Sequence, residues 1–120
     1  MNRPGQRRLR VLFVCAMNKQ RSVTAELVYQ NDARLGERSA GVRTGASRRV
    51  SEDDLRWADV VFVMENEQKS WIKSRFQGLD LPRIEVLGVP DEFEVMDAEL
   101  VEILRLTLDP EIEHLTSESS

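Results

Sequence analysis

The chain has 120 residues, of which 41% are hydrophobic, enough for one modest core, and we expect a single domain over residues 1–120. No stretch approaches the roughly 20 apolar residues of a membrane helix, and the basic residues 1–10 lack the apolar segment of a secretory signal. The lone cysteine excludes an intrachain disulfide and argues against a zinc cluster. We therefore expect a cytoplasmic protein with no metal, no cofactor and no membrane partner.

Charge is distributed unevenly along the sequence. Residues 1–49 contain 11 Lys and Arg against 3 Asp and Glu, whereas residues 50–120 contain 6 against 18. A nucleic-acid-binding face would interleave aromatic residues with its cations, but the basic half has only Phe13 and Tyr29. We expect no nucleic-acid partner, and an electropositive end that attracts a phosphorylated substrate. A solvated basic tail is the alternative.

The first half of the chain predicts two strands and two helices. The apolar run at 11–14 is typical of a strand buried on both faces. Residues 21–35 predict a helix that ends at Gly36, and residues 37–42 a short second strand. Ser51 can cap a short helix that follows, because its hydroxyl can accept a first-turn backbone N–H.

The second half continues the alternation. Strands are predicted at 60–64 and 84–87, and helices at 66–76 and after a cap at Asp97. Pro110 is expected to end or break the last helix. Residues 114–120 are then expected to fray, with flexible tails at 1–8 and 115–120.

The order βαβαβαβα predicts an α/β fold of three αβα layers. Its four-stranded parallel sheet is expected in the flavodoxin-like order 2-1-3-4. Ligands bind such sheets at the carboxyl ends of the strands, near the point where the order reverses. That edge would bring together Cys15, Met64 and residues 89–91.

Seven residues, with the sequence CAMNKQR, connect the first strand to the first helix. A tight loop before a helix aims backbone N–H groups at one point and binds anions. The planar guanidinium of Arg21 can bind two phosphate oxygens. Positive surroundings favour the thiolate of Cys15, to which Ser22 can donate a hydrogen bond, and Lys19 adds charge or faces solvent. A lone cysteine is more often an inert, buried residue, but these neighbours favour a nucleophile.

A Cys-x5-Arg-Ser motif between a buried strand and a helix resembles the opening of the low-molecular-weight protein tyrosine phosphatases. The resemblance extends over most of residues 9–100 and is to a short subgroup of about this length. Asn18 matches the loop asparagine, Ser39-Ala40-Gly41 the segment after the second strand, and Val89-Pro90-Asp91 the loop of the general acid. It implies a phosphotyrosine protein phosphatase I-like fold.

The resemblance also implies a metal-independent phosphomonoester hydrolase, most simply a protein tyrosine phosphatase. Cys15 would form the phosphocysteine intermediate, Arg21 would stabilise the phosphoryl group, and Asp91 would act as acid and then as base. Asp91 as a plain solvated acid is the alternative, and Asp97 is a second candidate acid that we expect to be a helix cap. Phe93 would line the pocket wall or pack in the core. The substrate-binding loop residues are Ala16, Met17, Asn18, Lys19, Gln20 and Ser22, with Asn18 and Ser39 as structural support.

Three departures from the family pattern concern four positions. Gln20 replaces a second loop cysteine, so peroxide should drive Cys15 to irreversible oxidation. Met17 replaces a common glycine and could narrow the pocket. Glu92 and Phe93 replace Pro and Tyr, which puts extra negative charge beside the acid.

Several functions remain open on the sequence. The partner is expected to be a phosphorylated protein or a small phosphomonoester, with inorganic phosphate as product, and the protein is expected to be a monomer. The alternatives are a non-catalytic phosphate- or phosphopeptide-binding homologue, a phosphoarginine phosphatase and an arsenate reductase-like enzyme. An arsenate reductase would need further cysteines to relay electrons within the chain, and this sequence has only one cysteine. A phosphocysteine carrier of sugar-transport systems needs no arginine at the end of the loop, so Arg21 argues against that function.

Overall fold

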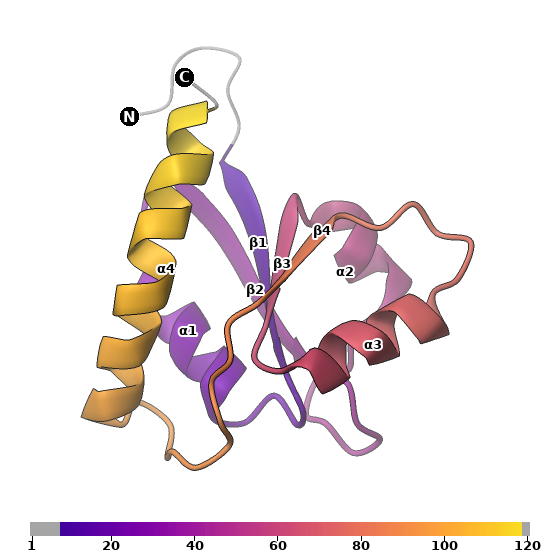
Figure 1. Cartoon of the computed structure of the whole chain (residues 1–120), viewed down its shortest axis with the longest axis horizontal. Helices are drawn as coiled ribbons and strands as arrows, with labels where there is room; N and C mark the ends of the chain where they lie inside the picture. Colours follow the sequence, from indigo (N-terminus) through magenta and orange to yellow (C-terminus); the bar gives the residue numbers. More distant parts are fainter. Residues whose placement is uncertain (1–7, 119–120) are drawn as a thin grey trace.

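The computed structural model describes residues 8–118, and alternates strands and helices throughout (Figure 1). The expected element order is confirmed. The elements are β1 (Leu9–Cys15), α1 (Arg21–Tyr29), β2 (Leu35–Gly41), α2 (Glu52–Trp57), β3 (Val60–Val63), α3 (Asn66–Arg75), β4 (Arg83–Val86) and α4 (Ala98–Glu118). No helix in this part of the chain is both long and apolar enough to cross a membrane.

The four strands form one parallel sheet in the order β2-β1-β3-β4, as predicted. Val14 pairs with Val63, and Cys15 pairs with Gly41. The strand order reverses at β1, because the chain adds β2 on one side of it and β3 on the other. The end of β1 therefore lies at the switch point where parallel sheets bind ligands.

Alternate residues of β1 point into two separate cores. Val11, Phe13 and Cys15 join the core cluster that α1 and α4 cover, whereas Leu12 and Val14 join the cluster on the face of α2 and α3. Figure 1 shows this layering, with α4 and α1 on one side of the sheet and α2 and α3 on the other. All five side chains are at most 3% exposed, which explains the continuous apolar run of this strand.

Helix α1 is shorter than predicted. It ends at Tyr29, and two turn hydrogen bonds, from Asp32 N–H to the Tyr29 carbonyl and from Leu35 N–H to the Asp32 carbonyl, turn the chain back. Leu35 is fully buried and begins β2 opposite Leu9. Asn31 and Asp32 are weak helix formers, and Leu35 is buried in the sheet instead of extending the helix.

The expectation that Pro110 ends the last helix was wrong. Helix α4 continues through Pro110 to Glu118, so residues 114–118 are helical rather than frayed. An interior proline costs about 3 kcal/mol in an isolated helix, but Leu108 and Ile112 on either side are fully buried and each contributes about 2 kcal/mol. The carbonyl that loses its partner belongs to Leu106, whose side chain is 73% exposed, so water can reach this part of the helix.

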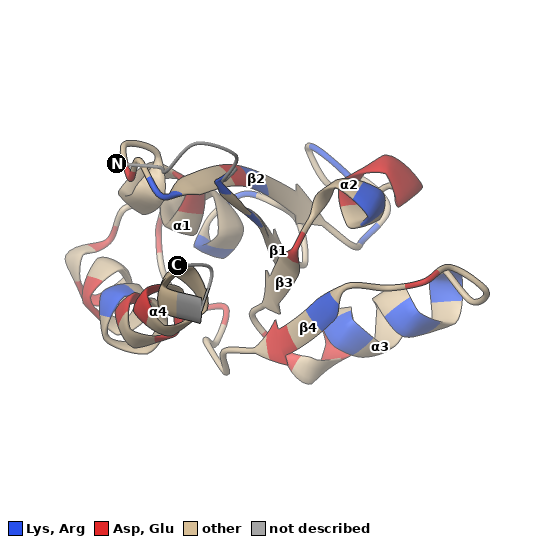
Figure 2. Cartoon of the chain, turned by 90° about the horizontal axis from the view of Figure 1, so that it is seen from above, with Lys and Arg blue, Asp and Glu red and all other residues tan. Residues whose placement is uncertain are grey.

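Part of the positive charge of residues 8–49 is paired with carboxylates. Figure 2 shows mostly basic bands on α3 and mostly acidic bands on α4. Five arginines from the first half each pair with a carboxylate; these are Arg21, Arg34, Arg38, Arg43 and Arg48. Residues 1–7 of the expected flexible N-terminal tail lie outside the described part.

Candidate active site

The Cys15 loop (residues 15–21) lies at the carboxyl edge of the sheet and is braced by the chain that follows β2. Two backbone N–H groups, of Val42 and Arg43, donate to the Ala16 carbonyl at 2.9 and 3.0 Å. Ser47 bonds to the loop twice: its N–H donates to the Met17 carbonyl at 3.2 Å and its hydroxyl to the Asn18 carbonyl at 2.7 Å. The loop is thus held from outside as well as by its own contacts.

Gly41 lets β2 approach the loop closely. A Cβ at this position would lie 2.7 Å from the Ala16 carbonyl oxygen, 2.8 Å from the Cβ of Ala46 and 2.9 Å from the Asn18 nitrogen. Two of these three atoms are backbone atoms of the loop, which cannot rotate away. The Ser-Ala-Gly segment therefore needs its glycine for packing against the loop.

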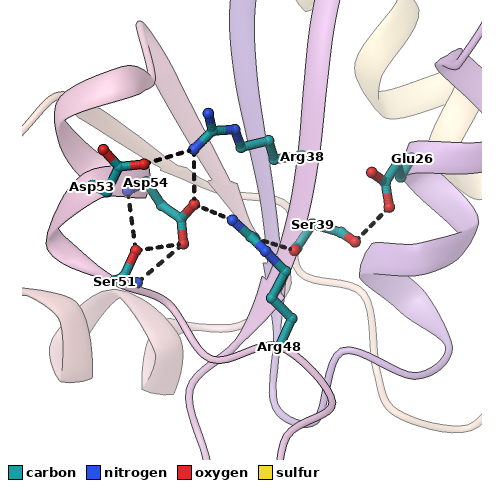
Figure 3. Close-up of polar contacts among 7 residues, drawn as sticks. All are labelled: Glu26, Arg38, Ser39, Arg48, Ser51, Asp53 and Asp54. Atoms are coloured by element: carbon teal, nitrogen blue, oxygen red, sulfur yellow. Dashed lines mark hydrogen bonds and ion pairs between the residues drawn. The ribbon is translucent and has the colours of Figure 1, made fainter.

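An electrostatic brace fixes the segment between β2 and α2 (Figure 3). Asp54 is fully buried and accepts hydrogen bonds from Arg48 and from Arg38, the latter at 3.1 Å. Ser51 and Asp54 form the capping box of α2, which confirms the predicted cap. Arg48 also donates to the Ser39 carbonyl at 2.7 Å, and its own carbonyl accepts the Gly41 N–H at 2.7 Å. These hydrogen bonds thus reach Gly41, which packs against the Cys15 loop.

The sulfur of Cys15 is surrounded by hydrogen-bond donors. The Asn18 N–H donates to Sγ at 3.2 Å, and the Ser22 hydroxyl lies 3.0 Å from it. The same hydroxyl lies 2.8 Å from Oδ1 of Asn18, so its single proton can serve either atom. When Cys15 is a thiolate, this proton can turn to the sulfur, which gives the anion two donors.

Asn18 shapes the loop through both its backbone and its side chain. Its φ of 56° lies in the left-handed region, which asparagine tolerates better than most residues. This conformation aims its N–H at Cys15 while its side chain bonds to Ser22. The side chain is only 7% exposed, which fits the predicted supporting role.

Arg21 is almost entirely buried, with 2% of its surface exposed. Its Nη1 donates to Oε1 of Glu65 at 2.7 Å and to the Val89 carbonyl at 2.8 Å. Its Nε lies 3.8 Å from Oδ1 of Asp91, an exposed residue in the loop after β4. The guanidinium therefore joins the first helix, the end of β3 and the loop after β4.

A pocket of about 450 Å³ opens beside Arg21, lined by Ala16, Arg21, Arg43, Glu65, Asn66, Glu67 and Asp91, and the buried Cys15 is not among its lining residues. Three of these residues are acidic and two are basic, and no aromatic side chain is among them. The hydrogen bond from Arg21 lowers the pKa of Glu65, so this carboxyl group stays ionised over a wider pH range. The pocket thus combines the buried cation of Arg21 with a mouth where three carboxylates outnumber the one exposed cation, Arg43.

Most of the predicted site residues meet at this edge. Ala16 lines the pocket, Met17 and Asn18 are held by Ser47, and Ser22 contacts the sulfur. Asp97 accepts the Glu99 N–H at 2.8 Å and caps α4, as expected.

Four of the predicted site residues have no side-chain contact with the Cys15 sulfur among the described residues: Phe93, Ser39, Lys19 and Gln20. Phe93 is partly buried and packs against the core cluster that α1 and α4 cover, as the core alternative expects, and it is not among the residues that line the pocket beside Arg21. Ser39 donates to Glu26 at 2.6 Å rather than to the loop. Lys19 is exposed, and the carbonyl of Gln20 accepts the first helical N–H, from Thr24.

Sequence reasoning missed four residues that line the pocket, Arg43, Glu65, Asn66 and Glu67, and the loop-bracing residue Ser47. Glu65 comes directly after the third strand's last buried residues, so its place at the ligand-binding edge could have been read from the topology. Ser47 lies in an irregular segment without a motif, and only the folded chain shows that it bonds to Met17 and Asn18.

This strand order, with helices on both faces of the sheet, is that of the low-molecular-weight protein tyrosine phosphatase fold. Solved structures of that fold align over most of the chain. YfkJ from Bacillus subtilis aligns with a TM-score of 0.76 and 20% identity, over 97% of this chain and 99% of its own. A low-molecular-weight protein tyrosine phosphatase from Streptococcus pyogenes gives 0.73 and 20%, over 88% and 92%.

A third similar structure carries a different activity in its name. The YwlE arginine phosphatase from Geobacillus stearothermophilus aligns with a TM-score of 0.64 and 24% identity, over 92% of both chains. No protein-family model and no curated protein sequence matches this chain. The resemblance drawn from the sequence is thereby confirmed for the fold.

Proposed function

We propose that the protein is a phosphatase that hydrolyses phosphomonoesters through a phosphocysteine intermediate. The observation that carries this proposal is the grouping at the carboxyl edge of the sheet. There the Cys15 sulfur faces two hydrogen-bond donors, and Arg21 joins the neighbouring strand ends while its Nε lies 3.8 Å from Asp91. A nucleophile, a fixed cation and an acid are the three parts that this chemistry requires.

The reaction would proceed in two displacements. In the first, the Cys15 thiolate attacks phosphorus, a sulfur–phosphorus bond forms and the bond to the leaving oxygen breaks, while Asp91 gives that oxygen its proton. In the second, Asp91 removes a proton from water, the oxygen of which attacks phosphorus and releases the thiolate and inorganic phosphate. Arg21 would neutralise the charge on the phosphoryl oxygens in both transition states.

The experiment is the hydrolysis of para-nitrophenyl phosphate, with and without EDTA, by the wild type and by Cys15→Ser and Asp91→Ala. Turnover should survive EDTA, vanish in Cys15→Ser and fall by about 100-fold in Asp91→Ala. A folded wild type that binds phosphate without turnover would instead identify a non-catalytic binding homologue. Turnover lost in EDTA would contradict the metal-independent mechanism.

Phosphoarginine hydrolysis is a second candidate activity, favoured by the charge of the pocket mouth. Three carboxylates, of Glu65, Glu67 and Asp91, line the pocket against two guanidinium groups, of Arg21 and Arg43, which pair with Glu65 and Glu67. No aromatic side chain of the lining offers a surface on which a phenol ring could stack. Carboxylates are the usual partners of a guanidinium group. One of the structurally similar proteins is an arginine phosphatase.

The two substrates are separated by one peptide sequence prepared with phosphotyrosine or with phosphoarginine at the same position. The acidic mouth predicts a higher kcat/KM for the phosphoarginine peptide. A clear preference for the phosphotyrosine peptide would assign the enzyme to the tyrosine phosphatases and remove this candidate.

A further inference from the structure

The Asp91 loop (residues 90–96) starts from a fixed residue, Val89. The Val89 N–H donates to the Met64 carbonyl at 2.9 Å, and the Val89 carbonyl accepts a hydrogen bond from Nη1 of Arg21 at 2.8 Å. Val89 is also only 1% exposed. These contacts tie the start of the loop to the end of β3 and to the guanidinium that would hold the phosphoryl group. The loop therefore leaves the sheet from a defined point, just before Asp91.

Asp91 itself is held weakly. Its side chain is 60% exposed, and within residues 8–118 its one polar contact is the ion pair with Nε of Arg21, at 3.8 Å. That distance is too long for a hydrogen bond, so the carboxyl group depends on the loop backbone for its position. A general acid must come within about 3 Å of the leaving oxygen. The contacts that hold the rest of the loop therefore matter to the proposed reaction.

The far end of the loop is bonded to α1. The N–H of Met96 donates to Oγ1 of Thr24 at 2.9 Å, and these two residues are 72 positions apart in the sequence. Thr24 is fully buried on α1, the helix that begins with Arg21. In Figure 1 the loop runs from β4 past α1 to the start of α4. The Thr24 hydroxyl thus connects the Asp91 loop to the helix that carries Arg21.

The backbone of Met96 has a conformation that depends on its surroundings. Its φ of 60° lies in the left-handed region, which is uncommon for a residue other than glycine. Such a conformation persists where the surrounding structure fixes it. Two hydrogen bonds do so: the one to Thr24, and the turn bond from the Asp97 N–H to the Glu94 carbonyl at 3.1 Å. Of these two, the bond to Thr24 is the one that reaches another element of the fold.

We propose that Thr24 is a positioning residue that holds the Asp91 loop in place for proton transfer. The inference rests on the proposed function. With Val89 and Met96 both fixed, the backbone at Asp91 has a narrow range of positions beside Arg21. Phe93 packs partly against the core between these two ends, so loss of the Thr24 bond should loosen the loop without releasing it.

Two substitutions separate the hydroxyl of Thr24 from its shape. Thr24→Val keeps the branched shape and removes the acceptor, whereas Thr24→Ser keeps the acceptor and removes a methyl group. The readout is kcat/KM, which covers the first displacement, in which Asp91 acts as the acid. Positioning predicts a loss of about 10-fold for phenyl phosphate in Thr24→Val, because small misplacements of a catalytic group lower the rate this much. It predicts that Thr24→Ser stays within about twofold of the wild type.

The leaving group distinguishes a displaced acid from general damage to the site. Phenolate is a poor leaving group that needs a proton, whereas dinitrophenolate departs without one. Thr24→Val should therefore keep nearly all of its kcat/KM for dinitrophenyl phosphate. In an Asp91→Ala background there is no acid to position, so Thr24→Val should cause no further loss for phenyl phosphate.

The matched control is Thr107→Val. The Thr107 hydroxyl donates to the Ile103 carbonyl at 2.8 Å within α4, and Thr107 is not among the residues that line the pocket beside Arg21. The same exchange of a hydroxyl for a methyl group should here leave kcat/KM unchanged for both substrates. Thermal unfolding shows whether each variant is folded, and Thr24→Ala, which also removes the acceptor, replaces Thr24→Val if that variant is not.

Three results would each overturn the inference and leave the proposed phosphatase activity intact: an equal loss on both substrates, a loss that adds to that of Asp91→Ala, or equal activity of Thr24→Val and Thr24→Ser. A wild type without turnover refutes the proposed function instead. Hydrogen exchange of residues 90–96 then tests the hold on the loop by itself. Faster exchange in Thr24→Val than in Thr24→Ser supports that hold, and equal exchange in the two variants rejects it.

Discussion

Replacement of Gly41 by alanine tests whether the close approach of β2 shapes the Cys15 loop. The added Cβ would lie 2.7 Å from the Ala16 carbonyl oxygen and 2.9 Å from the Asn18 nitrogen. Ordinary contact begins at 3.4 Å, so the loop must move by about 0.7 Å relative to the strand. A displacement of this size next to the nucleophile is expected to lower kcat/KM by roughly 10- to 100-fold. Forced overpacking should also reduce the free energy of unfolding by about 1–3 kcal/mol.

The control lies in the same strand. A Cβ at Gly36 would meet only Cζ2 of Trp57, at 3.7 Å, so Gly36→Ala should leave activity unchanged. It should be neutral or slightly stabilising, because alanine restricts the unfolded chain more than glycine does. The assays are steady-state hydrolysis of para-nitrophenyl phosphate and urea unfolding of both variants. If Gly41→Ala matched Gly36→Ala in both assays, the loop would be free to yield, and the reasoning from close contact would be refuted.

Three further predictions follow from the ion pairs, the last helix and the lone cysteine. Burial alone would raise the pKa of Asp54, but hydrogen bonds from Arg48 and Ser51 outweigh it and hold the pKa below its usual value. The stability that ionised Asp54 gives the folded protein is therefore present above the unfolded pKa of about 3.9 and is lost as the pH falls through the lower folded value. Asp54→Asn should lower the free energy of unfolding by about 2 kcal/mol at neutral pH and flatten the acid side of the curve of stability against pH, measured by urea unfolding. Asp97→Ala should cost about 1 kcal/mol through loss of the α4 cap and leave kcat unchanged, and a large fall in kcat would instead make Asp97 the general acid. Peroxide should inactivate the enzyme irreversibly, since Cys15 is the only cysteine in the chain, and full recovery of activity with dithiothreitol would contradict this.

The fold could be predicted from the sequence because its signals are local. The buried run of β1, the apolar run of β3 and the capping residues Ser51 and Asp97 each mark an element by its own composition. Alternation of strands and helices then restricts the sheet to few orders, and the switch point places the Cys15 loop at the ligand-binding edge.

The errors arose where packing competes with a local preference. Residues 30–35 contain no Gly or Pro to stop a helix, but the chain turns after Tyr29 and Leu35 is buried in the sheet opposite Leu9. Pro110 should end a helix, but the buried residues on both sides of it keep α4 intact. In both cases the deciding energy comes from residues distant in sequence.

The sequence by itself determined which groups could do chemistry: a cysteine, an arginine six residues later and a serine in one loop, all within a span of eight residues. Only the tertiary structure decided how these groups are oriented. Glu65 and Val89 come from two other strand ends and fix Arg21, while Ser47 and Gly41 brace the loop from β2 and the segment after it. These contacts join residues 23 to 68 positions apart, and no local pattern encodes them, because each depends on where the folded sheet places the two partners.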